Sequence, residues 1–437
     1  MADLDQQKIR VVRIIARLNV GGPAKQALFL TQSLNNQVFQ SYLIAGAVGA
    51  NEENLAFPPS FPENRVYSIP MLGREISWWQ DIRAFFEISK VLKTIRPHIV
   101  HTHTAKAGTL GRLAAMWTSV PIKIHTFHGH VFKGYFSRWK TSFFIFIEKI
   151  LAYFTDRIVV LSESQRRDLA QTFKIAPSWK FQVIPLGFNL SPFISHGARS
   201  SSRIRFGIEL KSFVIGFIGR LVPIKNPFLL LEAYDQAKAW RQRKRAASVE
   251  NLQPWSVIVV GGGELHDAMQ SEVLARGLSQ QVVFYGWQHE VQHVHAAVNV
   301  VVLTSLNEGT PVALIEAMAA SKPFIATNVG GVADLMIGEG KRKVDDTGGS
   351  YVIFRNGILV DSQDSHGLAS ALLYVFSHPD EAQEMGRVGR DYAVKHFDES
   401  RLLGDVRALY QDLLAQKKRQ GGSAEYGNLN RPGRLSQ

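Results

Sequence analysis

The sequence predicts an α/β protein with two doubly wound domains. Short apolar runs rich in β-branched residues alternate with amphipathic helical segments along the chain, as expected for strands that are buried on both faces of a parallel sheet. Glycine-rich turns follow several of these runs, as in units where a strand leads into a helix. The 437 residues are sufficient for two hydrophobic cores, and 46% hydrophobic with 20% charged residues is a globular composition.

The N-terminal domain is expected to cover residues 1–190. Its first strand is followed by a Gly-Gly-Pro turn and an amphipathic helix that runs through Leu34. Apolar runs of strand length predict its strands at residues 11–16, 40–44, 65–69, 98–101, 122–127, 158–161 and 182–184. Residues 191–212 have weak periodicity and a composition typical of loops, which predicts an interdomain linker.

The C-terminal domain is expected to cover residues 213–395. Its strands are predicted at residues 213–218, 257–260, 282–285, 299–304, 323–327 and 357–360. Residues 338–351 are expected to form an additional charged, glycine-rich loop. Residues 396–416 are expected to form a helix that crosses back to the N-terminal domain, and residues 417–437 a disordered, low-complexity tail.

Composition narrows the cellular setting and the partners. The chain has no cysteine, which excludes disulfides and Cys-ligated metals. It begins without a secretory signal, and no apolar run reaches the ~20 residues that span a bilayer. The net charge of +13 suits an anionic partner such as a nucleotide, a phospholipid surface or a nucleic acid. We expect a cytoplasmic protein that is peripheral on the inner face of the plasma membrane.

Two carboxylates, Glu308 and Glu316, lie eight residues apart around the predicted start of a helix, with Thr310 as the N-cap and Pro311 at the first helical position. In a parallel βαβ unit the ligand lies beyond the carboxyl ends of the strands, so Glu308 is expected beside the ligand. Glu316 is expected to accept hydrogen bonds from a ribose diol. This spacing suggests a sugar-nucleotide site, although a solvated loop acid and a surface helix acid have the same sequence signature.

Two cations, Arg220 and Lys225, flank a second predicted helix start near Asn226, directly after Gly219. An arginine binds phosphate in a bidentate manner, and a lysine adds a point charge. The pair is therefore a candidate site for a diphosphate whose charge grows as the sugar leaves. The alternative is that both side chains are simply solvated.

Histidines cluster at the ends of two predicted neighbouring strands, at positions 101, 103, 125, 128 and 130. A histidine cluster suggests zinc, but no carboxylate or cysteine accompanies these residues at a metal-ligand spacing. Polar side chains at the carboxyl ends of parallel strands line a ligand cleft instead. We therefore expect no metal ion here.

The segment around the two glutamates resembles the signature of glycosyltransferase family 4, whose members are retaining enzymes of the GT-B fold. The matching residues are Ser305, Glu308-Gly309, Pro311, Glu316-Ala317-Met318-Ala319, Ser321, Pro323 and Gly330-Gly331. The family usually has Gly at position 321 and Asp at position 299, where this chain has Ser and Asn. The stretch from His101 to Arg112 is similar to family members that build bacterial surface polysaccharides on lipid carriers.

The resemblance implies a role for each candidate site residue. The catalytic residues would be His128, Arg220, Lys225 and Glu308. The donor would be bound by Gly21, Gly22, Gly219, Asn226, Gly262, Gly309, Thr310, Pro311 and Glu316. The acceptor would be bound by Lys106, Arg112 and His130, and His130 is also the neighbouring alternative to His128. No cofactor and no metal ion are expected, because the cations and the helix dipoles would neutralise the phosphates.

The function that the resemblance implies is retaining transfer of a hexosyl or N-acetylhexosaminyl group from a nucleoside diphosphate sugar, with UDP favoured. The acceptor would be a glycan or a polyprenyl-diphosphate-linked sugar, in surface polysaccharide or glycolipid biosynthesis. A GT-B sugar-nucleotide epimerase would share the fold and the donor without an acceptor. A non-catalytic basic protein that binds a membrane or nucleic acid is a third reading of the charge, although we do not expect nucleic acid as a partner.

An anionic membrane surface is a further expected partner. Three cations, Lys133, Arg138 and Lys140, precede a helix whose aromatic and aliphatic residues occupy nearly every face. Cations beside an exposed aromatic helix favour anionic headgroups. A helix that packs on a sheet is also apolar, so burial against the core explains the same residues.

Overall fold

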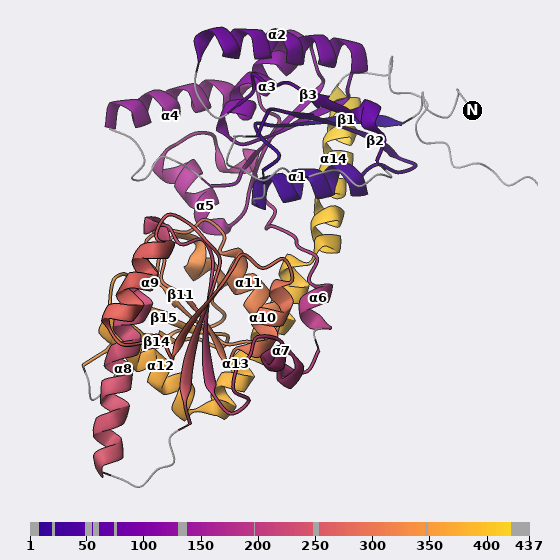
Figure 1. Cartoon of the computed structure of the whole chain (residues 1–437). Helices are drawn as coiled ribbons and strands as arrows, with labels where there is room; N and C mark the ends of the chain where they lie inside the picture. The colour runs from indigo at the N-terminus through magenta and orange to yellow at the C-terminus, as the bar shows by residue number, and fades with distance from the viewer. Residues whose placement is uncertain are drawn as a thin grey trace, which may run out of the picture. The chain divides into compact units, whose positions relative to one another are not determined.

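The computed structural model describes residues 8–19, 22–48, 55, 61–73, 77–129, 138–195, 197–247, 253–345 and 348–420. The chain forms two compact units, shown in Figure 1. The N-terminal unit comprises Met1–Gly187 together with Ser400–Gln437, and the C-terminal unit comprises Phe188–Glu399.

The N-terminal unit is built on a parallel seven-stranded sheet with the order β3-β2-β1-β4-β5-β6-β7. The strands are β1 (Ile9–Ile15), β2 (Phe39–Ala45), β3 (Val66–Ser68), β4 (Ile99–His103), β5 (Ile122–Phe127), β6 (Arg157–Val160) and β7 (Phe181–Val183). Its α-helices are α1 (Gly22–Ser33), α2 (Trp78–Ile95), α3 (Ala105–Trp117), α4 (Arg138–Tyr153), α5 (Glu163–Arg167) and α14 (Glu399–Gln420).

Helices cover both faces of this sheet (Figure 1). On one face, α2 buries Ala84, Ile88 and Leu92 together with residues of α3, β1 and β4. Their spacing of four residues places them on one side of the helix. On the other face, α14 contributes Leu402, Val406, Leu409 and Leu413 to a core shared with α1. A segment from the C-terminal end of the chain therefore completes the N-terminal core.

The C-terminal unit is built on an eight-stranded sheet with the order β10-β9-β8-β11-β12-β15-β14-β13. The strands are β8 (Phe213–Ile218), β9 (Trp255–Val260), β10 (Val282–Gly286), β11 (Val300–Leu303), β12 (Phe324–Thr327), β13 (Lys341–Val344), β14 (Ser350–Ile353) and β15 (Ile358–Val360). Its α-helices are α6 (Ser191–Ile194), α7 (Arg199–Arg205), α8 (Phe228–Ala247), α9 (His266–Ala275), α10 (Val291–Ala297), α11 (Val312–Ala319), α12 (Ser365–Ser377) and α13 (Pro379–Phe397).

This sheet is also covered on both faces. The helices α8, α9 and α12 bury residues such as Leu230, Met269 and Leu372 on one face, and α10, α11 and α13 pack on the other (Figure 1). Strands β8, β9 and β11 are adjacent and parallel. Their carboxyl ends therefore meet at one edge, where the βα loops that follow them lie together.

The predicted linker over residues 191–212 is wrong. The units divide between Gly187 and Phe188, and residues 191–194 and 199–205 form α6 and α7 of the C-terminal unit. The buried Arg203 of α7 donates to the carbonyl of Ala297 at 2.9 Å and to Oδ1 of Asn299 at 2.7 Å. Two helices this short leave little periodicity in the sequence, and their partners lie more than 90 residues further along the chain.

Other expected boundaries also change. Residues 341–353 contain the antiparallel strands β13 and β14 rather than only a loop, and β14 pairs with β15. The end of the C-terminal unit lies at Glu399 rather than at residue 395. Residues 396–416 include the end of α13 and most of α14, and α14 continues to Gln420, into the expected tail. The remainder of that tail, residues 421–437, lies outside the described residues.

The helix α4 is only partly buried, although its sequence is apolar on nearly every face. Leu151 and Ala152 are buried, whereas Phe143, Phe146 and Tyr153 are exposed. Lys133 and the side chains of residues 138 and 140 lie outside what the structure describes. None of the helices in the described part of the chain is both long enough and apolar enough to span a bilayer.

Candidate active site

The centre of the site is an ion pair between two βα loops of the C-terminal unit. Nζ of Lys225, after β8, contacts Oε1 of Glu308, after β11. The Glu308 side chain is only 8% exposed, and it also accepts a hydrogen bond from Oγ of Ser305 at 2.5 Å. The structure therefore brings together two predicted catalytic residues that are 83 positions apart in the sequence.

Hydrogen bonds to backbone carbonyls fix the positions of these two loops relative to each other. Oγ1 of Thr304 donates to the carbonyl of Lys225 at 2.9 Å, and the amide of Leu306 donates to the carbonyl of Ile224 at 2.8 Å. A third loop, after β12, supports the first two. A Cβ on Gly331 would lie 1.8 Å from the carbonyl oxygen of Gly309, so only glycine fits at position 331.

The helix α11 begins one residue later than predicted. Val312 is its first residue and Pro311 occupies the N-cap position, with no side-chain hydrogen bond to the cap. Thr310 is therefore not the N-cap. Pro311 adopts an extended conformation with ψ of 95°, and its carbonyl accepts from the amides of Leu314 and Ile315. The first amides of α11 have no side-chain cap, so they remain suited to an anion.

Glu316 lies in the second turn of α11, as predicted, but it faces a residue that sequence reasoning missed. Its Oε2 is 3.5 Å from Nε2 of His295, a fully buried residue of α10. Among the residues that the structure describes, neither ring nitrogen of His295 has a hydrogen-bond partner. Its position in a short helix, without a recognisable motif, gave no signal, because the pairing depends on how α10 packs beside α11.

The glycine-rich turn after β9 packs against the loop that carries Arg220. A Cβ on Gly261 would lie 2.0 Å from the carbonyl oxygen of Gly219, and one on Gly262 would lie 2.6 Å from Nε1 of Trp287. The Arg220 side chain is exposed. Asn226 ends the short 3₁₀ turn after Val222 in a left-handed conformation with φ of 45°. These predicted donor residues therefore share one edge of the sheet with Glu308.

The predicted histidines of the N-terminal unit form a buried hydrogen-bonded cluster. Nδ1 of His103 lies 2.9 Å from Nε2 of His128, and the His101 and His103 rings stack with centroids 4.5 Å apart. Nδ1 of His125 lies 2.9 Å from Oγ1 of Thr102. Gly21 and His130, two further predicted site residues, lie outside the described residues.

The position of the His101 proton follows from its neighbours. A buried arginine, Arg13, donates to Oη of Tyr410 at 3.2 Å and cannot accept. The Tyr410 hydroxyl then donates to Nδ1 of His101, which lies 2.7 Å away. His101 therefore carries its own proton on Nε2 and donates it to Oγ1 of Thr126 at 2.7 Å. The tyrosine comes from α14, so the C-terminal helix completes this network.

Burial keeps the histidine cluster neutral. Desolvation lowers the pKa of His128 to about 3 and lowers the pKa values of His101, His103 and His125 well below the usual 6.5. Nearby charges, including Arg13 and Arg112, lower the pKa values of the last three further. Near pH 7 His128 is therefore neutral, and its ring can form hydrogen bonds but carries no positive charge.

We expect the protein to lose stability as the pH falls from 7.0 to 5.5. Over this range the unfolded chain binds protons at histidines of pKa about 6.5 that stay neutral in the folded state. Each buried histidine then contributes a loss of up to about 1.4 kcal/mol per pH unit. Urea unfolding at both pH values measures the loss. A His125→Asn variant should show a smaller slope, and a variant of the exposed His289 should not. Equal stability at the two pH values would contradict the neutral cluster.

The structure does not support Arg112 as an acceptor ligand. Its side chain is 1% exposed and donates from NH2 to both carboxylate oxygens of Glu148 at 2.9 and 2.8 Å. Its Nε donates to the carbonyl of Gly108. Lys106 forms an ion pair with Asp81 at 2.6 Å. A Cβ on Gly22 would meet no atom within 4 Å, so packing within the described structure does not require this glycine.

We expect Arg112→Met to destabilise the protein by about 3–5 kcal/mol, because it leaves the buried carboxylate of Glu148 without its partner. The double variant Arg112→Met, Glu148→Leu should recover most of that loss. Urea unfolding gives both values. Arg387→Met removes an exposed pair with Glu384 and is the control, with little expected change. Unchanged stability of Arg112→Met together with lost acceptor binding would instead favour the sequence-based assignment.

Within the described ranges, no group of three or more His, Asp or Glu side chains is arranged to hold a metal ion. Within the cluster, His101 is hydrogen-bonded to Thr126 and Tyr410, and His125 to Thr102.

The family of the chain follows from sequence models of known families. Residues 20–192 match the model described as Glycosyltransferase Family 4, and residues 199–392 match the model described as Glycosyl transferases group 1. The chain belongs to glycosyltransferase family 4.

Individual relatives agree with this placement. The chain is 28% identical to an Escherichia coli UDP-Gal:alpha-D-GlcNAc-diphosphoundecaprenol alpha-1,3-galactosyltransferase. The alignment covers 94% of this chain and 98% of the relative. It is 26% identical over 78% of its length to 84% of the putative glycosyltransferase EpsD of Bacillus subtilis. Among solved structures, Anabaena Alr3699/HepE in complex with UDP aligns with a TM-score of 0.71 at 18% identity, covering 92% of this chain and all of that one. These similarities confirm the predicted GT-B fold.

Proposed function

We propose that the protein transfers a hexosyl or N-acetylhexosaminyl group from a UDP-sugar to a lipid-linked acceptor, with retention of configuration at the anomeric carbon. The observation that carries the proposal is the partly buried Lys225–Glu308 pair at the edge where the loops after β8, β9 and β11 meet. This edge is where open α/β sheets bind their ligands. Exposed Arg220 on one of these loops and the uncapped start of α11 add positive potential for a diphosphate.

In the proposed reaction, the bond between the anomeric carbon and the β-phosphate oxygen breaks as the acceptor oxygen bonds to the anomeric carbon. The acceptor proton passes to a phosphate oxygen of the departing UDP, so no protein nucleophile is needed. Lys225 and Arg220 stabilise the negative charge that develops on the diphosphate. Glu308 orients Lys225 and positions the sugar hydroxyls. We propose that these cations and the α11 dipole neutralise the phosphates without a divalent metal ion.

The neutral histidine cluster suits a positioning role in the N-terminal unit. His128 contacts His103 through Nε2, and its buried Nδ1 has no hydrogen-bond partner among the described residues, so a sugar hydroxyl is the partner that we propose for it. A neutral ring can donate or accept such a hydrogen bond. We propose that His128 holds the donor sugar and does not abstract a proton.

The choice of UDP and of a lipid-linked acceptor draws on relatives. The Escherichia coli relative is named for UDP-galactose and for a diphosphoundecaprenol acceptor, and HepE is a complex with UDP. An enzyme with a polyprenyl-linked acceptor would act at the membrane that holds this lipid, and we propose the anionic cytoplasmic face of the plasma membrane. An epimerase would leave the acceptor unused, and the relatives named above are glycosyltransferases.

We expect UDP to raise the unfolding temperature of the parent and to do so much less for Glu316→Ala. If Glu316 accepts hydrogen bonds from the ribose, the variant loses about 1–3 kcal/mol of nucleotide affinity. Differential scanning fluorimetry with UDP, GDP and ADP measures this, because a ligand at about 100 times its Kd adds about 2.7 kcal/mol of stability. The exposed Glu339→Gln is the matched control. Equal UDP stabilisation of the parent and Glu316→Ala would refute the ribose role.

A further inference from the structure

The solvent face of α2 in the N-terminal unit carries large apolar side chains. Trp78 and Trp79 are 81% and 80% exposed, and Phe86, about two helical turns further on, is 59% exposed. Trp117, the last residue of α3, is 66% exposed. The helices α2 and α3 are neighbours in the N-terminal unit (Figure 1). We call these four residues the aromatic face.

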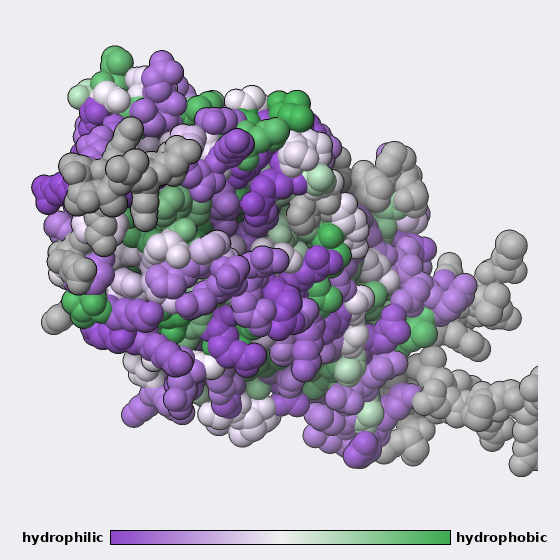
Figure 2. Space-filling model, turned by 90° about the horizontal axis from the view of Figure 1, so that it is seen from below, coloured by the Kyte–Doolittle hydropathy of each residue, from purple (hydrophilic) through white to green (hydrophobic). Residues whose placement is uncertain are grey.

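Packing among the described residues of the N-terminal unit does not account for the aromatic face. The helix α2 already buries Ala84, Ile88 and Leu92 against the sheet, and a surface helix is normally polar on the opposite side. Single exposed apolar residues are common, but three tryptophans and a phenylalanine on two adjacent helices form a cluster. On the view in Figure 2, by contrast, hydrophilic residues dominate and hydrophobic ones are scattered between them.

The charges on α2 are mainly positive. Arg83, Lys90 and Lys93 are exposed, and Arg96 follows the last residue of the helix. The helix has two acids, and one of them, Asp81, is paired with Lys106 of α3. Glu87 is the other. Cations therefore outnumber acids on the same helix that exposes the tryptophans.

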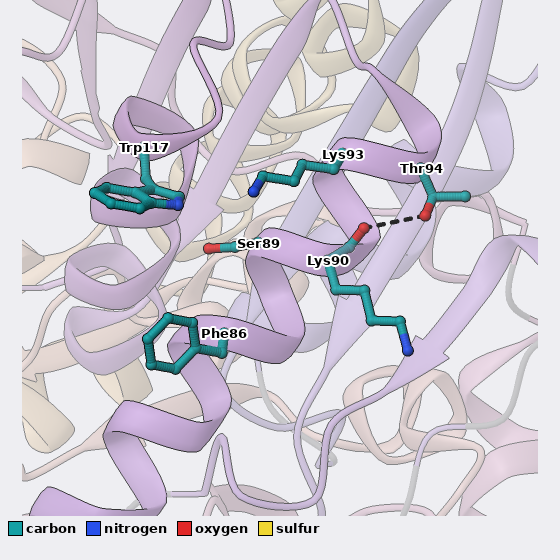
Figure 3. Close-up of a pocket in the computed structure, with 6 residues that line it drawn as sticks. All are labelled: Phe86, Ser89, Lys90, Lys93, Thr94 and Trp117. Atoms are coloured by element: carbon teal, nitrogen blue, oxygen red, sulfur yellow. Dashed lines mark hydrogen bonds between the residues drawn. The ribbon is translucent and has the colours of Figure 1, made fainter.

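Two residues of the aromatic face border a groove of about 470 Å³, which is lined by Phe86, Ser89, Lys90, Lys93, Thr94 and Trp117. Figure 3 shows the rings of Phe86 and Trp117 as two walls, with the hydroxyl of Ser89 between them. The amino group of Lys93 extends toward Trp117, whereas Lys90 extends away from the two rings (Figure 3). The Ser89 hydroxyl donates to the carbonyl of Phe85 at 2.8 Å, so its hydrogen is already used. The ammonium of Lys93 therefore offers a phosphate a charged donor beside an apolar surface.

We propose that the aromatic face docks on an anionic phospholipid bilayer and that its groove takes a lipid headgroup phosphate. Tryptophan prefers the membrane interface, and lysines beside it attract anionic headgroups. Lys93 and Lys90 bind phosphates while Trp78, Trp79 and Trp117 enter the headgroup layer. This inference rests on the proposed lipid-linked acceptor, and it assigns the surface that brings the enzyme to that acceptor. It differs from the predicted association through α4.

Two readouts test the proposal on the full-length protein. Cosedimentation with vesicles of phosphatidylcholine alone or with one third phosphatidylglycerol, at low and high salt, measures binding without any nucleotide sugar. Quenching of tryptophan fluorescence by brominated phosphatidylcholine reports which rings reach the lipid. We expect binding to anionic vesicles that weakens at high salt, accompanied by quenching.

Matched variants locate the surface. Trp78→Ser, Trp79→Ser should lower anionic vesicle binding at least tenfold, and Lys90→Glu, Lys93→Glu should remove its salt-sensitive part. The double variant Lys341→Glu, Lys395→Glu makes the same charge change at exposed sites of the C-terminal unit and should bind like the parent. Trp78→Phe, Trp79→Phe, Trp117→Phe should keep most of the binding and lose most of the quenching. Unfolding temperatures confirm that each variant is folded.

Three outcomes would overturn the proposal. In the first, the parent stays in the supernatant at low salt. In the second, both α2 double variants bind vesicles like the parent, while the variant Phe143→Ser, Phe146→Ser on α4 abolishes binding. In the third, the aromatic face binds a second copy of the protein, so that the parent is dimeric and the variant Trp78→Ser, Trp79→Ser is monomeric. Turnover with a water-soluble acceptor distinguishes this failure from failure of the proposed function. If the protein binds vesicles but does not turn over, only the proposed function is contradicted. If it turns over but does not bind vesicles, only the docking surface is contradicted.

Discussion

Glu308→Gln is expected to lower sugar transfer by about 100- to 1,000-fold, the range measured when one group that stabilises transition-state charge is removed. Glutamine has the size of glutamate and still accepts from Ser305, but it removes the charge that orients Nζ of Lys225. Lys225 is then misplaced relative to the departing diphosphate. The loss should appear mainly in kcat, because misorienting Lys225 weakens the binding of the transition state more than the binding of the substrate.

Steady-state kinetics and unfolding temperatures of Glu308→Gln measure this effect. The matched control is Glu339→Gln, the same change at an exposed position of the same unit, which should turn over at the parent rate. Transfer by Glu308→Gln within threefold of the parent, in a protein with an unchanged unfolding temperature, would exclude the proposed role of this carboxylate.

Replacing the two cations should have separable effects. Lys225→Ala is expected to lower transfer by about 100-fold and also to lower the unfolding temperature, because it leaves the nearly buried carboxylate of Glu308 without its partner. Arg220→Ala is expected to weaken UDP binding and transfer with no change in unfolding temperature, because its side chain is exposed.

Titration with UDP, turnover and thermal unfolding of both variants measure the two effects. Lys341→Ala, an exposed lysine on β13, controls for the loss of one positive charge from the C-terminal unit. Parent-like turnover in both cation variants would remove the diphosphate site from this edge of the sheet.

Much of the fold was predictable because parallel strands buried on both faces leave a clear signal. The strand of residues 300–303 is the plainest case, because a run of β-branched residues ends in a loop before α11. Edge elements left less signal. The strand β13, Lys-Arg-Lys-Val, has exposed charges because it lies at the end of the sheet, so its pairing with β14 could not be inferred from hydrophobicity.

The site was predicted in part, for a similar reason. Glu308 and Lys225 each follow a strand, so their arrival at one edge is a consequence of topology. Their direct pairing depends on contacts such as that between Thr304 and the Lys225 carbonyl, which no local pattern encodes. The burial of Arg112 could not be predicted, because its partner Glu148 lies on another helix, 36 residues away. The sequence could therefore not show that this cation forms a buried ion pair.

The histidine cluster illustrates the same limit. Its position at the ends of β4 and β5 was predictable, whereas its neutral state was not. That state depends on burial and on Tyr410, which reaches His101 from α14, 309 residues further along the chain. Interactions of this separation are set by packing, so they appear only when the whole unit has formed.

The most direct test of the central claim is an assay of sugar transfer to a lipid carrier. Purified protein is incubated with labelled UDP-galactose, UDP-glucose or UDP-N-acetylglucosamine and a polyprenyl diphosphate that carries N-acetylglucosamine, and the product is analysed by mass spectrometry and NMR. The account predicts one α-linked sugar on the lipid, formed from an α-linked UDP-sugar by the parent and hardly at all by Glu308→Gln. A β-linked product, an epimerised donor without transfer, or equal transfer by Glu308→Gln would contradict it.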